Sequence, residues 1–425
     1  MALSLSESAA ANDHMRPVAG RTSAKAVRPS YITALLICFA AAAIQNFLGI
    51  LVVILFALQA GIVKNGKLHL NFLAGAFVII AFVVAARAAL PSQMTLAVQS
   101  QEAVRYLAFG LFAASLSKVR PAELIAALSI WIFLNILTYP IYVFTGLFAT
   151  SDATEVVRFS GLLPHANHLG YVAGSVLIGF LYLHFSGRMQ IRYLLAICLM
   201  CVFILVATRS SGSLLYVSIG VGALAIAVKP SARTIAIVVL AGILVTGLLF
   251  SPIGQQAIDK LLNFDFRTVL VKSQNYNFGN QGSSFAWRLS YWIALIEANI
   301  NSGPFYTIFG QGGGSTGLNN RIFSFMRHDP HSDYVRIFFE IGLSGFIVTY
   351  AALIWACAKS RATVISSAII FLPMLSSNTI ANSSVMFVII VLFWALHSSG
   401  FVNATKKNIP FNAIAGRVRQ HRSAV

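Results

Sequence analysis

Long apolar runs are the feature that most restricts how this chain folds. They recur from Tyr31 to Ser399. A helix that crosses a bilayer needs roughly 20 such residues, which leaves room for about a dozen spans. Of the 425 residues, 58% are hydrophobic and only 10% are charged, whereas soluble domains carry about 25% charged residues. The sequence therefore predicts an all-α polytopic membrane protein.

The apolar runs divide into about twelve predicted spans. These are 31–45, 47–63, 68–90, 103–117, 122–148, 168–187, 192–208, 212–228, 234–251, 333–358, 363–379 and 382–399. The first two are short or share one long run, so ten or eleven spans remain an alternative.

Basic residues in the short loops indicate the orientation, because cytoplasmic loops carry an excess of Lys and Arg. On this layout one face collects the pairs Lys64/Lys67, Lys118/Arg120, Arg188/Arg192, Lys229/Arg233 and Lys359/Arg361. Both tails are also basic, so we expect both termini in the cytoplasm and an even number of spans. The opposite, outer face then holds 149–167, 207–213 and a large loop, 252–332.

This layout predicts three parts: a disordered cytoplasmic tail, 1–30; a transmembrane catalytic bundle, 31–399, with the outer loop 252–332; and a basic cytoplasmic tail, 400–425. Within the loop, 283–300 repeats apolar residues at helical spacing and contains Trp287, Trp292 and Arg288. It predicts a short helix on the outer membrane surface. A net charge of +18 would favour nucleic-acid binding in a soluble protein. Here the basic residues lie mostly in the tails and short loops, where they indicate how the chain is oriented in the membrane. We therefore expect no nucleic-acid partner.

The stretch RHDPHSDYVRIFFEIGLSG, 327–345, concentrates scarce charge at the start of an apolar run. Asp329 and Pro330 predict a helix start, with His331 in the first turn at the outer membrane edge. The positive end of the helix dipole disfavours extra charge there, so the imidazole should stay neutral and able to accept a proton. For His328 and the pair His165/His168 the favoured interpretation is ordinary loop histidines.

Several arginines face the same side as His331 on this layout. Their forks bind phosphate oxygens in two-point geometry, and a lipid-linked diphosphate sugar is a suitable anion. A lone arginine at a span end can instead be a snorkelling anchor. The outward arginines are Arg158, Arg209, Arg288, Arg321, Arg327 and Arg336.

Other motifs carry little chemistry. The GQGGGSTG of 310–317 lacks the G-K-[ST] of a phosphate-binding loop and predicts a flexible hinge. The four cysteines lie inside apolar runs and predict small core residues. The H-x-x-H of 328–331 has no acidic or cysteine partner at ligand spacing. We therefore expect no metal and no cofactor.

A family resemblance starts from His331-Ser332 and, nine residues later, Gly342-Leu343-Ser344-Gly345. This spacing resembles the H-[N/S/Q]-x9-G-x-x-[G/T/Y] pattern of the O-antigen ligase/polymerase family, which includes exopolysaccharide polymerases. A Ser/Arg turn after a mid-chain span and an Arg-Trp segment inside a large outer loop also fit. The resemblance covers roughly 150–400. The family turn often reads Ser-Arg, whereas here Arg209 precedes Ser210.

The resemblance implies a multi-span, GT-C-like inverting glycosyltransferase in the inner membrane of a bacterium. Such enzymes take a glycan from undecaprenyl diphosphate in the periplasm and join it to a hydroxyl acceptor, either lipid A–core or another glycan. The family's base would correspond to His331. Diphosphate-binding arginines would correspond to Arg209 and Arg288, with Arg327 as a further candidate. The remaining candidates are auxiliary His328, Arg158 and Arg336, and the structural pair Gly342 and Gly345.

Three alternatives stay open. A ligase that uses lipid A–core is slightly favoured over a polymerase of lipid-linked repeat units. A transporter or flippase would place ionisable residues in mid-membrane, and the predicted span interiors are nearly free of charge. A scaffold role alongside other polysaccharide export proteins is the last alternative.

Overall fold

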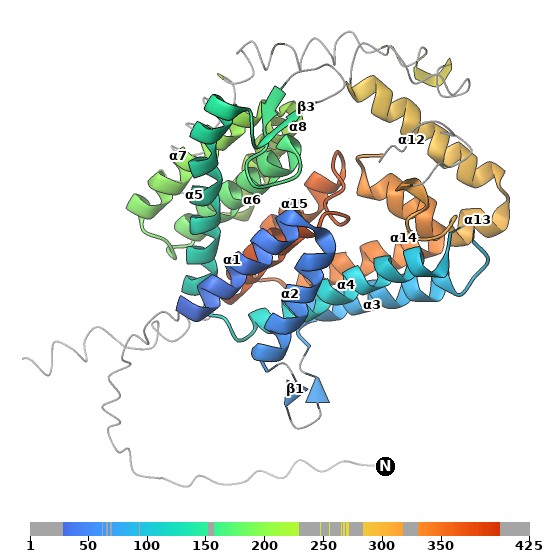
Figure 1. The fold of residues 1–425 in the computed structure, drawn as a ribbon, viewed down its shortest axis with the longest axis horizontal. Coiled ribbons are helices and arrows are strands. Elements are labelled where there is room, and N and C mark those ends of the chain that lie inside the picture. Colours follow the sequence, from blue (N-terminus) through green and yellow to red (C-terminus); the bar gives the residue numbers. More distant parts are fainter. Residues whose placement is uncertain are drawn as a thin grey trace, which may run out of the picture.

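A computed structural model describes residues 29–61, 63–64, 67–68, 70–92, 94–151, 157–228, 284–317 and 330–399, with isolated positions 247, 255, 265, 267 and 269–271. Within these residues the chain is a bundle of helices (Figure 1). The N-terminal helices are α1 Pro29–Ile44, α2 Asn46–Gln59, α3 Phe72–Ala88, α4 Leu96–Leu116, α5 Pro121–Thr145, α6 Ala166–Phe185, α7 Ile191–Thr208 and α8 Ser211–Ala227. The later helices are α12 Ser284–Asn301, α13 Pro304–Phe309, the short 3-10 helix η1 Ser315–Gly317, α14 Asp333–Lys359, α15 Thr363–Met374 and α16 Ser383–Ser398.

Two small antiparallel hairpins interrupt the helical pattern. One pairs β1 Val63–Lys64 with β2 Lys67–Leu68, in the turn between α2 and α3. The other pairs β3 Ala149–Ser151 with β4 Val157–Phe159, just before α6. Both lie in connections between helices, so the all-α class predicted from the sequence is confirmed.

Each predicted span except 234–251 coincides with a described helix. Apart from position 247, that span lies outside the described residues. Four described helices are long and apolar enough to cross a membrane: α5, α6, α7 and α14. Six shorter apolar helices accompany them. The prediction that the chain is a helical membrane protein is confirmed, while the number of twelve spans stays a prediction.

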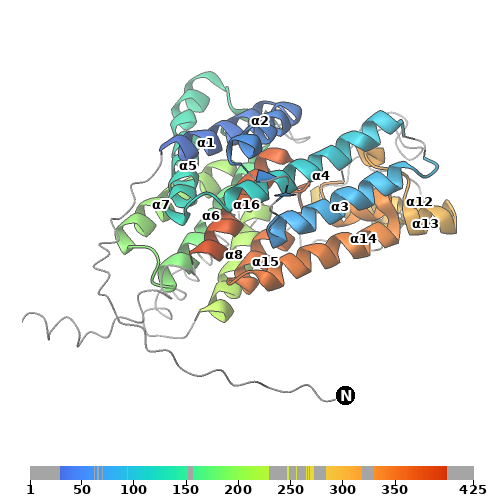
Figure 2. The same cartoon turned by 90° about the horizontal axis from the view of Figure 1, so that it is seen from below.

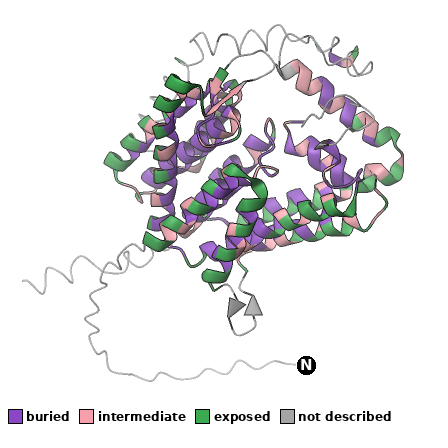
Figure 3. Ribbon diagram, in the orientation of Figure 1, coloured by how far each residue is buried: buried purple, intermediate pink, exposed green. Residues whose placement is uncertain are grey.

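The core forms around α16 and α6. In α16 every residue from Ser383 to Leu396 is buried, and α6 is buried almost throughout. Helix α16 contacts α1, α4, α5 and α6 (Figure 2). Figure 3 shows exposed residues in green along the outer helices. Many of the exposed side chains are large and apolar; Phe144 is 86% exposed and Leu199 is 72% exposed. Such exposed apolar side chains suit helices that contact lipid.

Small residues let α6 and α8 approach closely. A Cβ added at Gly174 would lie 2.7 Å from a methyl group of Val217. The hydroxyl groups of Ser175 and Tyr216 also bond across this contact, at 2.8 Å. Close approach of helices at small residues and interhelical hydrogen bonds are common means of association in membranes. Helix α8, which follows the Arg209 turn, is thereby fixed against α6.

The start of α14 differs from the sequence prediction. The helix begins at Asp333 with Ser332 as N-cap, not at Pro330 with Asp329 as cap. His331 therefore precedes the helix and has a left-handed φ of 51°. The prediction that it lies in the first turn is wrong. At the observed start, the Asp333 carboxylate accepts the backbone N–H of Ile380 at 3.0 Å, and the Ser332 hydroxyl donates to the carbonyl oxygen of Met374 at 3.5 Å.

The glycine-rich stretch is a packed element, so the hinge prediction is wrong. Helix α14 contains a break at Gly342, where φ is 69° and ψ is −173°. The carbonyl groups just before the break accept hydrogen bonds from outside the helix: Phe339 from the Gln311 N–H at 2.8 Å and Glu340 from the Gly312 N–H at 2.9 Å. The break thus exposes carbonyl oxygens, and the glycine-rich stretch satisfies them.

Candidate functional site at the start of helix α14

Contacts on both sides of His331 fix its position. On one side, the indole N–H of Trp292 in α12 donates to the carbonyl oxygen of Pro330 at 2.6 Å. On the other side, the backbone N–H of Ile380 donates to the Asp333 carboxylate at 3.0 Å, and Asp333 is fully buried. A left-handed backbone is unfavourable for a non-glycine residue. The flanking contacts therefore hold His331 in a backbone conformation that is unfavourable for an isolated histidine.

Aromatic rings surround the His331 imidazole. The ring of Trp287 in α12 lies 6.5 Å from it between centroids. On the other side the His165 ring lies 6.3 Å away, and the His168 ring lies 5.7 Å from His165. Residues from α12, the start of α6 and the segment before α14 are thereby brought together.

A cavity of about 190 Å³ opens beside these histidines. We call it the histidine cavity; its lining residues are Asn46, His165, His168, His331, Asn378, Ala381 and Asn382. They come from the α1–α2 turn, the start of α6, the segment before α14 and the α15–α16 connection. None of these lining residues is a carboxylate, a lysine or an arginine.

Hydrogen bonds fix the tautomers of two of the histidines. The side-chain oxygen of Asn382 accepts the N–H groups of Ser384 and Val385 at the start of α16. Its NH₂ group therefore faces His168 and donates to Nδ1, 3.0 Å away. His165 Nδ1 accepts the backbone N–H of Asn167 at 3.1 Å and caps α6. In both neutral rings the proton then resides on Nε2.

The interpretation of His165 and His168 as ordinary loop histidines is corrected by this arrangement. His165 is the N-cap of α6 and His168 lies inside that helix, and both line the cavity with His331. The amides Asn46, Asn378 and Asn382 were missed from the sequence. The signal was present in SSNTIANSS, 376–384, a polar stretch between two apolar spans.

Arg209 and Arg158 lie around the same side of α6. Arg209 is the left-handed C-cap of α7, with φ of 48°, and is exposed. The next residue, Ser210, donates from its hydroxyl to the Asn167 side-chain oxygen at 2.9 Å. Arg158 donates to the same oxygen at 3.3 Å. Asn167 stands between His165 and His168 in sequence, so this oxygen links the Arg209 turn to the cavity wall.

Arg288 approaches from α12. Its guanidinium donates to the carbonyl oxygen of Ser376 at 3.4 Å, and the Ser376 hydroxyl bonds to the hydroxyl of Tyr171 in α6. Its neighbour Trp287 contacts His331. The described structure thus brings Arg288 and His331 to one end of the bundle. Arg327 and His328 lie outside the described residues.

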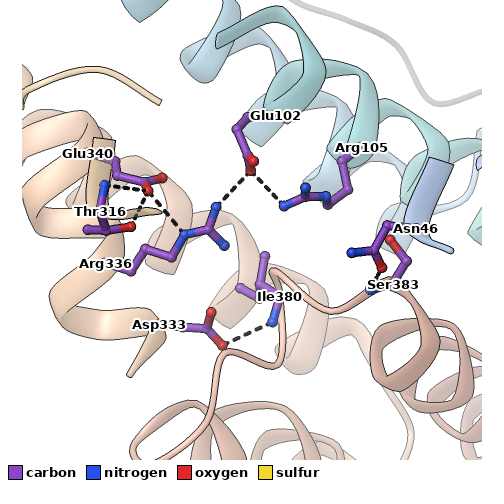
Figure 4. A network of polar contacts seen from close by, with 9 residues as sticks. All are labelled: Asn46, Glu102, Arg105, Thr316, Asp333, Arg336, Glu340, Ile380 and Ser383. Atoms are coloured by element: carbon purple, nitrogen blue, oxygen red, sulfur yellow. Dashed lines mark hydrogen bonds and ion pairs between the residues drawn. The ribbon is translucent and has the colours of Figure 1, made fainter. Parts of the chain in front are cut away.

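Arg336 has a different environment. Its guanidinium bonds Glu102 in α4 at 2.8 Å and Glu340 in α14 at 3.2 Å. Glu102 also bonds Arg105 at 2.8 Å, as Figure 4 shows. We call Glu102, Arg105, Arg336 and Glu340 the arginine–glutamate cluster. An anionic substrate would have to displace carboxylates to reach Arg336, so its described contacts join α14 to α4.

The predicted helix 283–300 is confirmed as α12, Ser284–Asn301. Gly342 is the break in α14, and Gly345 follows it as a buried residue. No set of three or more His, Cys, Asp or Glu side chains is arranged to hold a metal ion in the described part of the chain.

Comparison with known families gives one match. The model of the O-antigen ligase family matches residues 195–350, from within α7 to within α14. The matched segment contains Arg209, Arg288, His331 and Gly342, and it lies inside the region where the sequence motif predicted the resemblance. No curated protein matches the chain. Residues 195–350 are therefore similar to the O-antigen ligase family, and this match supports the resemblance that the sequence motif predicted.

Proposed function

We propose that this protein is an O-antigen ligase-type glycosyltransferase of the bacterial inner membrane. It moves a glycan from undecaprenyl diphosphate to a hydroxyl group of lipid A–core at the periplasmic face, without a metal ion. The observation that carries the proposal is the position of His331, which lies inside the segment matched by the ligase family and lines the histidine cavity.

His331 acts as the general base in this proposal. The acceptor hydroxyl attacks the anomeric carbon, its proton passes to the imidazole, and the bond from that carbon to the diphosphate oxygen breaks with inversion. His165 and His168 are poor alternatives because each Nδ1 lone pair already accepts a hydrogen bond. Proton transfer to a positioned base typically contributes about 10²–10⁴-fold in rate.

Arginines stabilise the leaving diphosphate. Arg209 and Arg288 take this role, with Arg327 as a further member. The described bond of Arg288 is to a carbonyl oxygen, a weaker partner for a guanidinium than a phosphate oxygen. A diphosphate at this end of the bundle would therefore be favoured, and its growing negative charge would be stabilised as the bond breaks.

The contacts at the two ends of the bundle support the orientation. Asn46, His165 and Asn382, all expected on the outer face, line one cavity. At the other end, the Tyr182 hydroxyl donates to the carbonyl oxygen of Arg361 at 3.5 Å, and Arg361 belongs to a basic loop expected inside. With the basic loops in the cytoplasm, the histidine cavity faces the periplasm.

Reconstitution tests the function. Purified protein in proteoliposomes receives an undecaprenyl-diphosphate-linked oligosaccharide, with or without lipid A–core. New glycan on lipid A–core supports the ligase. Longer lipid-linked chains without lipid A–core would indicate a polymerase, and movement of the donor without any new glycosidic bond would indicate a flippase and contradict the proposal.

A further inference from the structure

We propose that the histidine cavity is the binding site for an uncharged sugar of the acceptor, held through its hydroxyl groups by Asn378 and Asn46 beside His331. The proposal rests on the proposed function and adds the chemical class that this cavity selects. It separates the neutral, sugar-binding part of the site from the arginines that receive the diphosphate.

The composition of the lining supports a neutral ligand. Asparagine amides and imidazoles provide both donors and acceptors, while none of the described residues of the lining is a carboxylate, a lysine or an arginine. A diphosphate is best recognised by guanidinium forks, and Arg288 lies outside the lining, on Ser376. A sugar ring presents hydroxyl groups that both donate and accept, which matches the lining.

Asn378 is the strongest evidence for a ligand. The residue is only 4% exposed and lines the cavity. Its side-chain oxygen is buried and has no hydrogen-bond partner within the described residues. An unsatisfied buried acceptor is costly. Once the Asn378 amide turns toward the cavity, a hydroxyl group of a bound sugar would supply the missing donor.

Asn46 contributes donors from the start of α2. Its side-chain oxygen accepts the backbone N–H of Ser383 at 3.2 Å. That bond fixes which end of the amide faces the protein, so the NH₂ group is the end that can donate to a ligand. Asn46 thus has donors for a ligand, and Asn378 adds an acceptor when its amide turns toward the cavity, a pairing that a hydroxyl-bearing ring can satisfy.

The size of the cavity and the place of His331 favour the acceptor over the donor. A volume of about 190 Å³ equals roughly six water molecules in the liquid, which is enough for one sugar ring. The group that loses a proton to His331 belongs to the acceptor. Because His331 lines this same cavity, a sugar held there places its hydroxyl next to the base.

Binding of defined sugars tests the site. Protein in phosphatidylcholine nanodiscs is titrated with neutral trisaccharides that end in glucose, galactose or N-acetylglucosamine, and binding is followed by saturation-transfer NMR. The test variants are Asn378→Leu, which removes the buried acceptor at similar volume, and Asn46→Asp, which keeps the bond to Ser383 but removes the donors. Thr379→Val is the matched control, because Thr379 is an adjacent buried residue that is not part of the lining.

At least one trisaccharide is expected to bind the wild type. Both test variants should weaken that binding by about three- to tenfold, the loss expected for one neutral hydrogen bond, while Thr379→Val should not. Excess inorganic pyrophosphate should not displace the sugar. No binding by any probe, equal binding by Asn378→Leu and wild type, or displacement by pyrophosphate would each overturn the proposal.

Kinetics separate this proposal from the proposed function. In the reconstituted assay, Asn378→Leu should raise KM for the acceptor and leave KM for the lipid-linked donor unchanged. A raised donor KM alone would assign the cavity to the donor sugar instead. If the wild type binds sugar but forms no glycosidic bond, the proposed function fails and the sugar site stands; if transfer proceeds with unchanged acceptor KM in Asn378→Leu, the sugar site alone fails.

Discussion

Two polar regions at the same end of the bundle differ in how their charges are matched. In the arginine–glutamate cluster, Arg336 bonds carboxylates from two helices, and Glu102 bonds a second arginine. Among its described lining residues, the histidine cavity has amides and imidazoles but no carboxylate. The cluster is also linked to the glycine-rich stretch, because the Thr316 hydroxyl donates to Glu340 at 2.5 Å.

The difference shows how to assign roles to polar groups in an apolar bundle. A buried charge is costly unless a partner is present. Where the protein supplies the partner, as for Arg336, the group serves the fold. Where polar groups line a cavity and one of them, Asn378, has a buried oxygen without a described partner, we propose a ligand as the partner. Each prediction below tests one side of this comparison.

The largest effect is expected at the base. His331→Ala should lower transfer by about 10²–10⁴-fold while the protein stays folded and inserted, because the described contacts that hold this segment come from Pro330 and Asp333. Transfer is measured in proteoliposomes and folding by thermal unfolding in detergent. The matched control is His184→Gln, at the far end of α6, where the imidazole contacts the Met189 carbonyl group. Transfer within tenfold of wild type would exclude His331 as base.

The arginine–glutamate cluster should respond in stability instead. Glu102→Leu leaves two guanidinium groups without their shared carboxylate, and breaking a buried ion pair costs about 3–5 kcal/mol. Glu102→Gln keeps the shape and a hydrogen-bond acceptor and should lose less. Thermal unfolding in detergent compares the two variants. If Glu102→Leu unfolds at the wild-type temperature, the cluster does not hold α14 to α4.

Most of the helices were predictable because each apolar run can be recognised from its own local sequence. The helices that begin at Asn46, Phe72, Ser211 and Ser383 lie within a few residues of predicted spans. The break at Gly342 was not predictable from apolar periodicity. It depends on a glycine-rich stretch, 310–317, that is about 30 residues away in sequence and supplies N–H groups to the exposed carbonyls.

The candidate site was only partly predictable. The sequence motif selected His331, and the Arg-Trp segment selected Arg288 and its neighbour Trp287, which contacts His331. The sequence indicated only an auxiliary role for Arg336 and did not reveal that carboxylates surround it. The carboxylate of Glu102 lies 234 residues before Arg336 in the chain, and only the packing of α4 against α14 reveals that pair.

A smaller effect is expected for the diphosphate arginines. Arg288→Lys keeps the charge but loses the planar fork. We expect transfer to fall about tenfold, the size of one charge-assisted hydrogen bond, mainly through a higher KM for the lipid-linked donor. Arg120→Lys, in a basic loop at the opposite end of the bundle, is the control. Unchanged donor KM in Arg288→Lys would mean that this arginine only attaches α12 to Ser376.

The smallest change in stability is expected at Arg209, and it separates a structural role from a binding role. Arg209 has a left-handed backbone, which costs a non-glycine residue about 1 kcal/mol or more. Arg209→Gly relieves that strain but adds freedom to the unfolded chain, worth about 0.4–1 kcal/mol. The two terms nearly cancel, so thermal unfolding should change little. Donor KM should nevertheless rise, because the guanidinium is gone. A sequence that retains arginine where glycine fits the backbone better is expected to use the side chain; if Arg209→Gly keeps wild-type donor KM, the diphosphate contact belongs to other arginines.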